Sequence, residues 1–270
     1  MTSRADRRHH AVAERVALLA ADPAFVRLEG LHCVKHAVRF GAAVDLLVTA
    51  DREAAVGLAN ILVPDLRARL VEELLEIPAA DVSAVMGPRR FDVLGFARRP
   101  TSFEGPAAGP AVLLEDPRNL GNLGAAVRVA AGFGARAVWT TGSVDPWHPT
   151  VVRASAGLHF ALSVDRIAGL DAVAPGGDGP LLAFDPGGDD VREVTITDGA
   201  ILAFGSERRG LSPGLRRRAD RLVAIPMRDR VSSYNLATSV AVALFRWSTT
   251  GGHETSWQPE PGRQPSEESW

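Results

Sequence analysis

Three short stretches in the C-terminal half combine Gly or Pro with polar side chains that can do chemistry. The first is DPRNLGNLGAAVR at 116–128, whose polar groups include Asn119, Asn122 and Arg128. A helix that starts inside this stretch would point free backbone N–H groups outward, an arrangement that suits an anion. The stretch also fits an ordinary helix that Asn122 caps and that carries a surface arginine. Spacing alone favours this simpler interpretation.

The second stretch is ILAFGSERRGLS at 201–212, where a predicted strand runs into Gly205 and Glu207 follows. Glycine at a strand end lets a ligand approach the backbone closely. A plain strand–turn–helix connection with a solvated glutamate is an equally good interpretation. The spacing differs from GxGxxG, so the dinucleotide-binding fingerprint is absent and a nicotinamide-dependent dehydrogenase is disfavoured.

The third stretch is AIPMRDRVSSYNLATSVAVALF at 224–245. A strand ends near Pro226, a loop carries Ser233 and Asn235, and an apolar helix follows. Such a helix belongs to a core or an interface, since nearly all of its residues are apolar or small. The two polar side chains also fit simple helix capping.

Taken together and in this order, the three stretches resemble the SpoU/TrmH group of the SPOUT superfamily, which are RNA ribose 2′-O-methyltransferases. The matching patterns are N-x-G-x-x-x-R, F-G-S-E-x-x-G-L-S and I-P-M-x-x-x-V-S-S-x-N. The resemblance covers 111–247. More loosely, EGLHCVKHAVRFG at 29–41 looks like the opening of the L30e-like domain that often precedes this catalytic domain.

The resemblance implies a fold, a cofactor and partners. It implies an α/β protein: a parallel-sheet methyltransferase domain with a SPOUT-type trefoil knot, preceded by a small L30e-like α/β domain that binds the RNA substrate. S-adenosylmethionine would lie bent in the knot, and its methyl group would go to a ribose 2′-hydroxyl of a structured rRNA or tRNA. The family is usually a homodimer with the site near the subunit interface. A 2′-hydroxyl target also explains selection of RNA over DNA.

Carried over by position, the resemblance implies two groups of site residues. The catalytic group is Asn122, Arg128, Glu207, Ser233 and Asn235, and the cofactor-binding group is Gly205, Ile225, Met227 and Tyr234. The chain departs from the family in having Tyr234 in place of the usual Leu and Arg208 in place of Gly. Either Asn119 or Asn122 could be the asparagine of the first motif, and the spacing to Arg128 favours Asn122.

Two accounts of Arg128 are open at this point. The resemblance implies that it takes the 2′-hydroxyl proton, although the reference pKa of arginine, about 12.5–13.8, makes it an unusual base. In the second account Arg128 stays charged, fixes a phosphate and stabilises the developing alkoxide. A catalytically weak RNA-binding protein of the same fold is a further alternative, which the intact Arg128, Ser233 and Asn235 disfavour.

Hydrophobic patterning predicts the elements that position these stretches. From residue 111 strands and helices alternate, which favours a mostly parallel sheet covered on both faces. The predicted strands are 111–115, 137–141, 181–184, 201–204 and 221–226, and the predicted helices are 122–133, 150–157, 213–219 and 234–247. In the N-terminal half we expect a helix at 31–40, a strand at 45–49, a helix at 65–76 and a short element at 81–86.

The expected organisation is a basic N-terminal helix or arm at 1–22, an RNA-binding domain at 23–104, the methyltransferase domain at 111–248 and a disordered tail at 249–270. The boundary is the Pro- and Gly-rich stretch PTSFEGPAAGP at 100–110.

Composition excludes several classes of protein. With 270 residues, 46% hydrophobic and 23% charged, the chain is neither wholly disordered nor collagen-like. Cys33 is the only cysteine, so no internal disulfide or cysteine cluster forms. His32 and His36 lack further ligands nearby, and no metal is expected. No secretory signal or apolar membrane span is apparent, so the expected compartment is the cytoplasm.

The formal net charge of −2 neither supports nor excludes RNA binding, which depends instead on local clusters of basic residues. All but Lys35 of the 30 basic residues are arginines. Arginine makes planar, bidentate phosphate contacts. The segments that could follow phosphates are 4–15, 89–90, 98–99 and 208–221, and each also fits a solvated surface.

Overall fold

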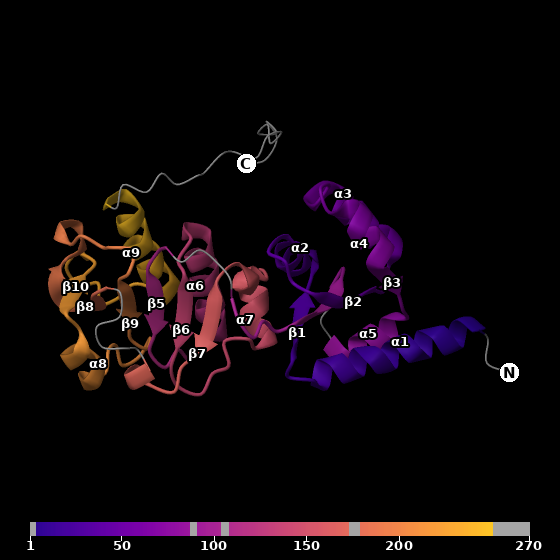
Figure 1. Cartoon of the computed structure of the whole chain (residues 1–270), viewed down its shortest axis with the longest axis horizontal. Coiled ribbons are helices and arrows are strands. Elements are labelled where there is room, and N and C mark those ends of the chain that lie inside the picture. Colours follow the sequence, from indigo (N-terminus) through magenta and orange to yellow (C-terminus); the bar gives the residue numbers. More distant parts are fainter. Residues whose placement is uncertain (1–3, 87–90, 104–107, 173–178, 251–270) are drawn as a thin grey trace.

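A computed structural model describes residues 4–86, 91–103, 108–172 and 179–250. They form two sheets, one in each half of the chain, that lie side by side in Figure 1. Residues 251–270 of the predicted tail, Arg89–Arg90 and part of the predicted linker lie outside the described residues. Thr249 and Thr250, which we assigned to the tail, instead end the last helix. Among the described residues, no helix has the length and apolar character needed to cross a bilayer, and no group of histidine, cysteine and acidic side chains could hold a metal ion.

The C-terminal sheet has six strands in the order β10-β8-β9-β5-β6-β7, and every neighbouring pair is parallel. The predicted parallel sheet is therefore confirmed. Its strands are β5 (Ala111–Leu114), β6 (Ala137–Thr140), β7 (Ser163–Arg166), β8 (Leu181–Asp190), β9 (Ile201–Phe204) and β10 (Arg221–Ala224). The sequence analysis missed β7 and the second half of β8.

Helices cover both faces of this sheet. On one face lie α6 (Leu120–Phe133), α7 (Pro149–Ala154) and α9 (Leu236–Thr250), and on the other lies α8 (Pro213–Arg218). Strand β5 is apolar throughout because both of its faces are buried. Val112 and Leu114 pack toward α6 and α9, whereas Ala111 and Leu113 pack toward α8. A parallel strand that is buried on both faces reads as a continuous apolar run.

The N-terminal sheet is smaller and mixed, in the order β1-β4-β2-β3. Strand β4 runs antiparallel to β1 and β2, while β2 and β3 are parallel. Its elements are α1 (Arg4–Ala21), β1 (Phe25–Glu29), α2 (Leu31–Arg39), β2 (Val44–Thr49), α3 (Arg52–Leu62), α4 (Arg67–Glu73), β3 (Leu74–Glu76), α5 (Ala79–Met86) and β4 (Leu94–Arg98).

The predicted helix at 65–76 is wrong at its C-terminal end. Helix α4 stops at Glu73, and Leu74–Glu76 form β3, which pairs with the end of β2. Leu74 is buried in either arrangement, so its apolar character could not separate the two. The sequence analysis also missed β1, α3 and β4.

The two halves meet where β1 packs against α7 and α2 packs against η1 (Leu158–Ala161), the short helix that follows α7 (Figure 1). The Glu29 carboxylate is buried and forms ion pairs with Arg27 and with Arg153 of α7. His36 Nδ1 lies 2.8 Å from the carbonyl oxygen of Ala156. The backbones approach so closely that a Cβ on Gly157, whose φ is +75°, would lie 2.4 Å from the carbonyl oxygen of Cys33.

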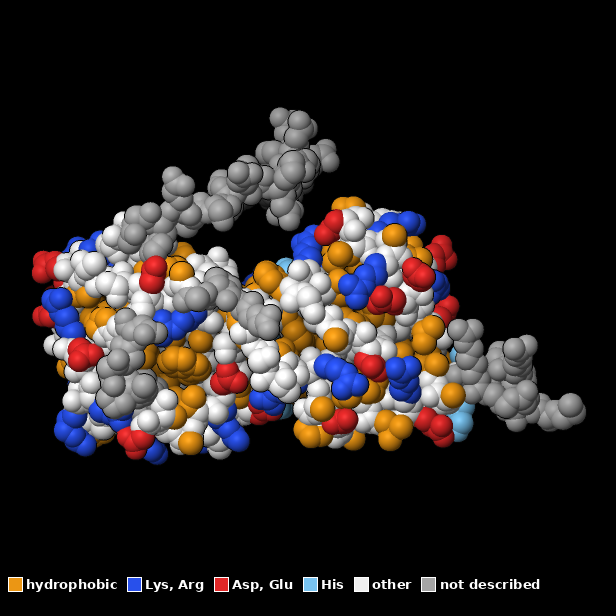
Figure 2. All heavy atoms as spheres, viewed as in Figure 1, with side chains coloured by type: hydrophobic (Ala, Val, Ile, Leu, Met, Phe, Trp, Pro, Cys, Tyr) orange, Lys and Arg blue, Asp and Glu red, His pale blue; other side chains and the backbone are white. Residues whose placement is uncertain are grey.

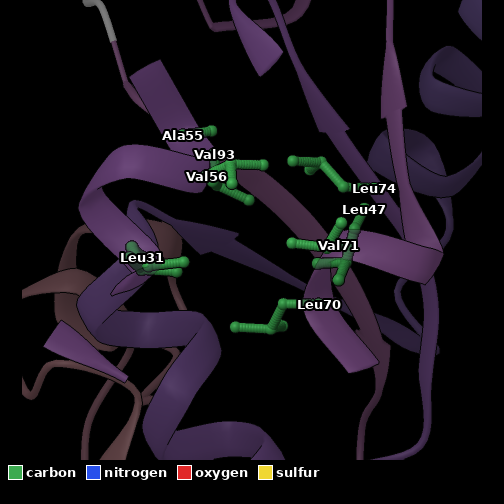
Figure 3. Close-up of a pocket in the computed structure, with 9 residues that line it drawn as sticks. Leu31, Leu47, Ala55, Val56, Leu70, Val71, Leu74 and Val93 are labelled. Carbon is green, nitrogen blue, oxygen red and sulfur yellow. The ribbon is translucent and has the colours of Figure 1, made fainter. Parts of the chain in front are cut away.

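The face of the molecule in Figure 2 and one cavity carry no evident chemistry. On the face in Figure 2, basic and acidic side chains are interspersed over both halves, without a single basic stripe. A small cavity in the N-terminal half is enclosed by α2, α3, α4 and the adjoining strands, and only aliphatic side chains line it (Figure 3). We interpret this cavity as a packing gap, because a dry apolar void offers a ligand no polar contact.

Candidate active site

An open cavity of about 650 Å³ lies where β9 and β10 end and where β8 ceases to pair with β9. Because these strands are parallel, their carboxyl ends share one edge of the sheet, where α/β proteins commonly bind ligands. All three sequence motifs contribute to it. The predicted residues that line the cavity are Asn122, Gly205, Glu207, Ile225, Met227, Ser233, Tyr234 and Asn235.

The first motif begins α6, and its cap corrects our prediction. Asn119, not Asn122, caps the helix: its Oδ1 accepts a hydrogen bond of 3.0 Å from the backbone N–H of Asn122. The helix therefore begins at Leu120 instead of residue 122. Because Asn119 does the capping, the side chain of Asn122 is available for contacts outside the helix.

A chain of hydrogen bonds joins the three motifs at the cavity wall. Asn235 Nδ2 donates to Asn122 Oδ1 at 2.9 Å. Asn122 Nδ2 in turn donates to Glu207 Oε1 at 3.2 Å. Asn235 Oδ1 also accepts from the backbone N–H of Ala237 at 2.9 Å, so this residue caps α9 as well as linking the motifs. Capping and site contact, which the sequence left as alternatives for Asn235, are both present.

The carboxylate of Glu207 lies at the start of α6. Its Oε2 accepts from the backbone N–H of Arg118 at 3.4 Å, beside the contact with Asn122. A negative charge is favourable at a helix N-terminus because it faces the positive end of the helix dipole. Glu207 is therefore held by α6, in contrast to the freely solvated side chain that the sequence left open.

The second motif forms a tight turn in which Ser206 and Gly210 exchange backbone hydrogen bonds of 3.1 and 2.9 Å. A Cβ on Gly205 would lie 2.0 Å from the carbonyl carbon of Gly210. The absence of a side chain at Gly205 is thus required by the chain itself.

Two aromatic rings form part of the cavity wall. Phe184 ends the regular β8–β9 pairing opposite Phe204, and their rings stack with centroids 4.6 Å apart and planes 12° apart. Asp185 follows at once and also lines the cavity. The sequence analysis missed all three residues, although the repeated ends LLAF at 181–184 and ILAF at 201–204 were a signal that could have found the aromatic pair.

The third motif forms a loop that closes on itself. The hydroxyl of Tyr234 donates to the carbonyl oxygen of Pro226 at 3.1 Å, which brings the two ends of the loop together. Ser232 and Ser233 lie between them, and both are exposed and line the cavity. Tyr234 therefore has a side-chain role that the leucine usual in the family could not fill.

Arg128 is the one predicted site residue that does not line the cavity. It is exposed, and its charge helps to lower the pKa of His36 in α2, which burial lowers most. Burial likewise lowers the pKa of His32, with further contributions from Lys35 and Arg128. Six residues along a helix turn the side chain by about 600°, so Arg128 and Asn122 point about 120° apart. This rotation agrees with a guanidinium that lies outside the cavity and acts on the two histidines of α2.

Comparisons with known proteins agree with this geometry. The model of the SpoU rRNA Methylase family matches residues 109–245. Ribosomal RNA small subunit methyltransferase G 2 of Syntrophobacter fumaroxidans is 34% identical over 161 residues, which are 58% of this chain and 30% of that protein. The 23S rRNA (uridine(2479)-2′-O)-methyltransferase of Streptomyces viridochromogenes is 31% identical over 185 residues, 65% of this chain and 58% of the relative. The chain thus spans from under a third to somewhat over half of these relatives.

Solved structures share the fold over most of the chain. An AdoMet-bound rRNA methyltransferase from Sinorhizobium meliloti superposes with a TM-score of 0.70 at 25% identity, covering 92% of this chain and 97% of that one. The SpoU methyltransferase AviRb from Streptomyces viridochromogenes, in complex with AdoMet, gives a TM-score of 0.71 at 22% identity, covering 88% and 97%. The α/β fold with its parallel sheet is that of the SpoU methyltransferase structures, and the family model matches half of the chain. The chain belongs to the SpoU rRNA methylase family.

Proposed function

We propose that the protein transfers a methyl group from S-adenosylmethionine to a ribose 2′-hydroxyl of rRNA or tRNA. The observation that carries this proposal is the hydrogen-bonded series Asn235–Asn122–Glu207, which unites the three family motifs at the wall of one cavity. The named activity of the Streptomyces viridochromogenes relative and the AdoMet complexes of the two solved structures support it.

The cavity suits S-adenosylmethionine in size and chemistry. Its volume of about 650 Å³ lies within the usual range for small-molecule sites, about 300–1,000 Å³. The stacked Phe184–Phe204 pair offers an apolar wall for a flat base, and Ser233 and Glu207 offer polar contacts at the rim. We propose that Gly205, Ile225, Met227 and Tyr234 hold the cofactor. When bound, it supplies an already activated methyl group on a sulfonium sulfur.

The protein's part of the chemistry is alignment. Orientation of two bound reactants can contribute about 7–11 kcal/mol to lowering a barrier. Asn122 and Asn235 fix each other by their amide contact, and Glu207 is held by Asn122 and by the backbone N–H of Arg118. We propose that these side chains and Ser233 orient the ribose at the cavity mouth.

Arg128 has a separate place in the proposal. It is exposed and lies near the imidazoles of His32 and His36, whose pKa values its charge helps to lower. This position supports the account in which Arg128 stays charged and holds an RNA phosphate near the reacting ribose. It offers less support for proton abstraction, since the guanidinium does not line the cavity.

The N-terminal half is proposed to be the RNA-binding unit. We assign it to 23–104 as an L30e-like domain, following a basic arm at 1–22, with the methyltransferase domain at 111–248. The contacts of β1 with α7, and of α2 with Ala156 and η1, support a role in presenting RNA to the cavity. DNA is not expected as a partner, because it lacks the 2′-hydroxyl.

A trefoil knot is proposed for the C-terminal half. After β10 at the sheet edge, the chain passes 225–235 beside the turn at 205–210, and α9 then packs against α6. This course supports the threading expected from the family.

We also propose a cytoplasmic homodimer. Phe245 on α9 is 61% exposed, and Val231 and Tyr234 near the cavity are each 42% exposed. A second copy of the chain would remove these apolar side chains from water.

The test is transfer of a labelled methyl group from S-adenosylmethionine to rRNA and tRNA, with DNA of the same sequence as the control. The proposal expects label on RNA alone, lost with Asn122→Ala and with Asn235→Ala. Binding of S-adenosylmethionine without any transfer to either RNA would favour the alternative, a catalytically weak RNA-binding protein of the same fold. Calorimetric binding of S-adenosylmethionine and of NAD distinguishes a methyltransferase from a nicotinamide-dependent dehydrogenase, which would bind NAD.

A further inference from the structure

Asp185 is a buried carboxylate in the cavity wall that none of the three motifs contains. It follows Phe184, where the β8–β9 pairing ends, and only 7% of its side chain is exposed. It lines the same cavity as Gly205 and Asn235. A buried charge is costly unless partners compensate it, so its retention at this place calls for an explanation.

Two partners hold this carboxylate. Asp185 Oδ1 accepts from the backbone N–H of Gly187 at 3.0 Å, and Oδ2 forms an ion pair with Arg216 of α8. An ionised carboxylate offers about four acceptor positions, and these contacts use two of them. The group is therefore rigid and retains acceptor capacity at the cavity wall.

The chemistry of the pair points to a particular ligand group. Arg216 balances the charge of Asp185. The pair therefore suits a ligand with neutral hydrogen-bond donors better than it suits a cation. The neighbouring Phe184–Phe204 stack suits a flat base, and the sugar of a nucleoside presents its hydroxyls a short distance from the base. Two adjacent hydroxyls match the two oxygens of one carboxylate.

We propose that Asp185 accepts hydrogen bonds from the ribose hydroxyls of the methyl donor, with Arg216 as the residue that positions it. The inference rests on the proposed use of S-adenosylmethionine and adds a residue that distinguishes ribose from deoxyribose in the cofactor. Hydrogen bonds to charged groups are worth enough to change affinity by about tenfold to a hundredfold.

The experiment is calorimetric binding of S-adenosylhomocysteine and of its 2′,3′-dideoxy analogue, so it does not depend on turnover. The wild-type protein is expected to bind the ribose compound at least about tenfold more tightly. With Asp185→Ala the two compounds should bind equally. Asp185→Asn retains the shape of the side chain and one acceptor oxygen, so its preference for the ribose compound should fall without disappearing. This variant replaces Asp185→Ala in the test if the alanine variant does not fold.

Asp189→Ala is the matched control. Asp189 lies on the same strand and pairs with Arg221 at 2.7 Å, but it is exposed and outside the cavity lining. It should keep the full ribose preference. A folded Asp185→Ala protein that still prefers the ribose compound overturns the inference. A wild-type protein that binds neither compound contradicts the proposed function itself, which separates the two failures.

Discussion

At the scale of single residues, the site depends on polar side chains that hydrogen-bond to one another and to a helix end. Asn119 caps α6, which leaves Asn122 available to bridge Asn235 and Glu207. The sequence identified the last three by resemblance, but it could not show which asparagine caps the helix, because both have the right chemistry and lie three residues apart. It also missed Asp185, since a single acidic residue after a strand carries no distinctive pattern.

Arg128→Ala tests the separation of RNA contact from cofactor binding. Because Arg128 is exposed and does not line the cavity, affinity for S-adenosylmethionine should stay within about twofold. Methyl transfer to RNA should fall about 10-fold to 100-fold, because a charge-assisted hydrogen bond to an RNA phosphate is worth about 1.5–3 kcal/mol. Steady-state transfer assays and calorimetry measure the two quantities. Arg192→Ala, a surface variant outside the cavity, is the control, and normal turnover in Arg128→Ala would refute the assignment.

At the scale of elements, the parallel strands bring the motifs together. The alternation of strands and helices from residue 111 predicts a parallel sheet, because β5, β6, β9 and the start of β8 are apolar runs. Strand β7 (SVDR) was missed because Val164 is its only buried residue. The N-terminal half was harder to predict. Leu74–Glu76 continue an amphipathic pattern from α4, and only the pairing with β2, a long-range contact, makes them a strand. The order of strands in either sheet likewise depends on pairings that no local pattern encodes.

Gly124 allows α6 to pack closely on α7, and substitution there tests how the first motif is supported. A Cβ on Gly124 would lie 2.4 Å from the carbonyl oxygen of Val151 and 2.5 Å from Cβ of Ala154. Gly124→Ala should therefore lower the free energy of unfolding by about 1–3 kcal/mol. Gly132→Ala, in the same helix with open space around it, should raise the free energy by up to about 1 kcal/mol. Urea denaturation measures both, and equal effects would contradict this packing account.

At the scale of the whole molecule, buried polar contacts join the two halves. Glu29 is 4% exposed and pairs with Arg27 and with Arg153. The pairing of Glu29 with Arg153 could not be predicted from local sequence patterns, because the two residues lie 124 positions apart. The junction sets how RNA held by the N-terminal half would meet the cavity.

Arg153→Met tests the junction, since it leaves the buried Glu29 with Arg27 alone. We expect the free energy of unfolding to fall by about 2 kcal/mol, less than for a fully buried pair because Arg153 is partly exposed. Arg69→Met removes an exposed pair with Glu73 and should cost about 0.5 kcal/mol or less. Denaturant titration of both variants is the measurement. If the first variant lost no more stability than the second, the junction would not be a stabilising contact.

His159 gives the whole molecule a pH-dependent stability. Burial lowers its pKa from 6.5 to about 4, and its ring nitrogens contact Ser155 and the carbonyl oxygen of Pro146. Between these two pKa values the unfolded chain binds the proton more readily, so stability must fall as the pH falls from 6.5 to 4, by about 3 kcal/mol for this group. Unfolding measured across this range should show a shallower slope for His159→Gln. An unchanged slope would exclude His159 as the source.

The most direct test of the central claim is the position of the transferred methyl group. RNA methylated by the protein with S-adenosylmethionine can be hydrolysed in alkali, which cleaves every linkage whose 2′-hydroxyl is free. A family-type site built from Asn122, Glu207 and Asn235 predicts an alkali-resistant dinucleotide that carries the label. Label recovered only on bases, in fully cleaved mononucleotides, would contradict it.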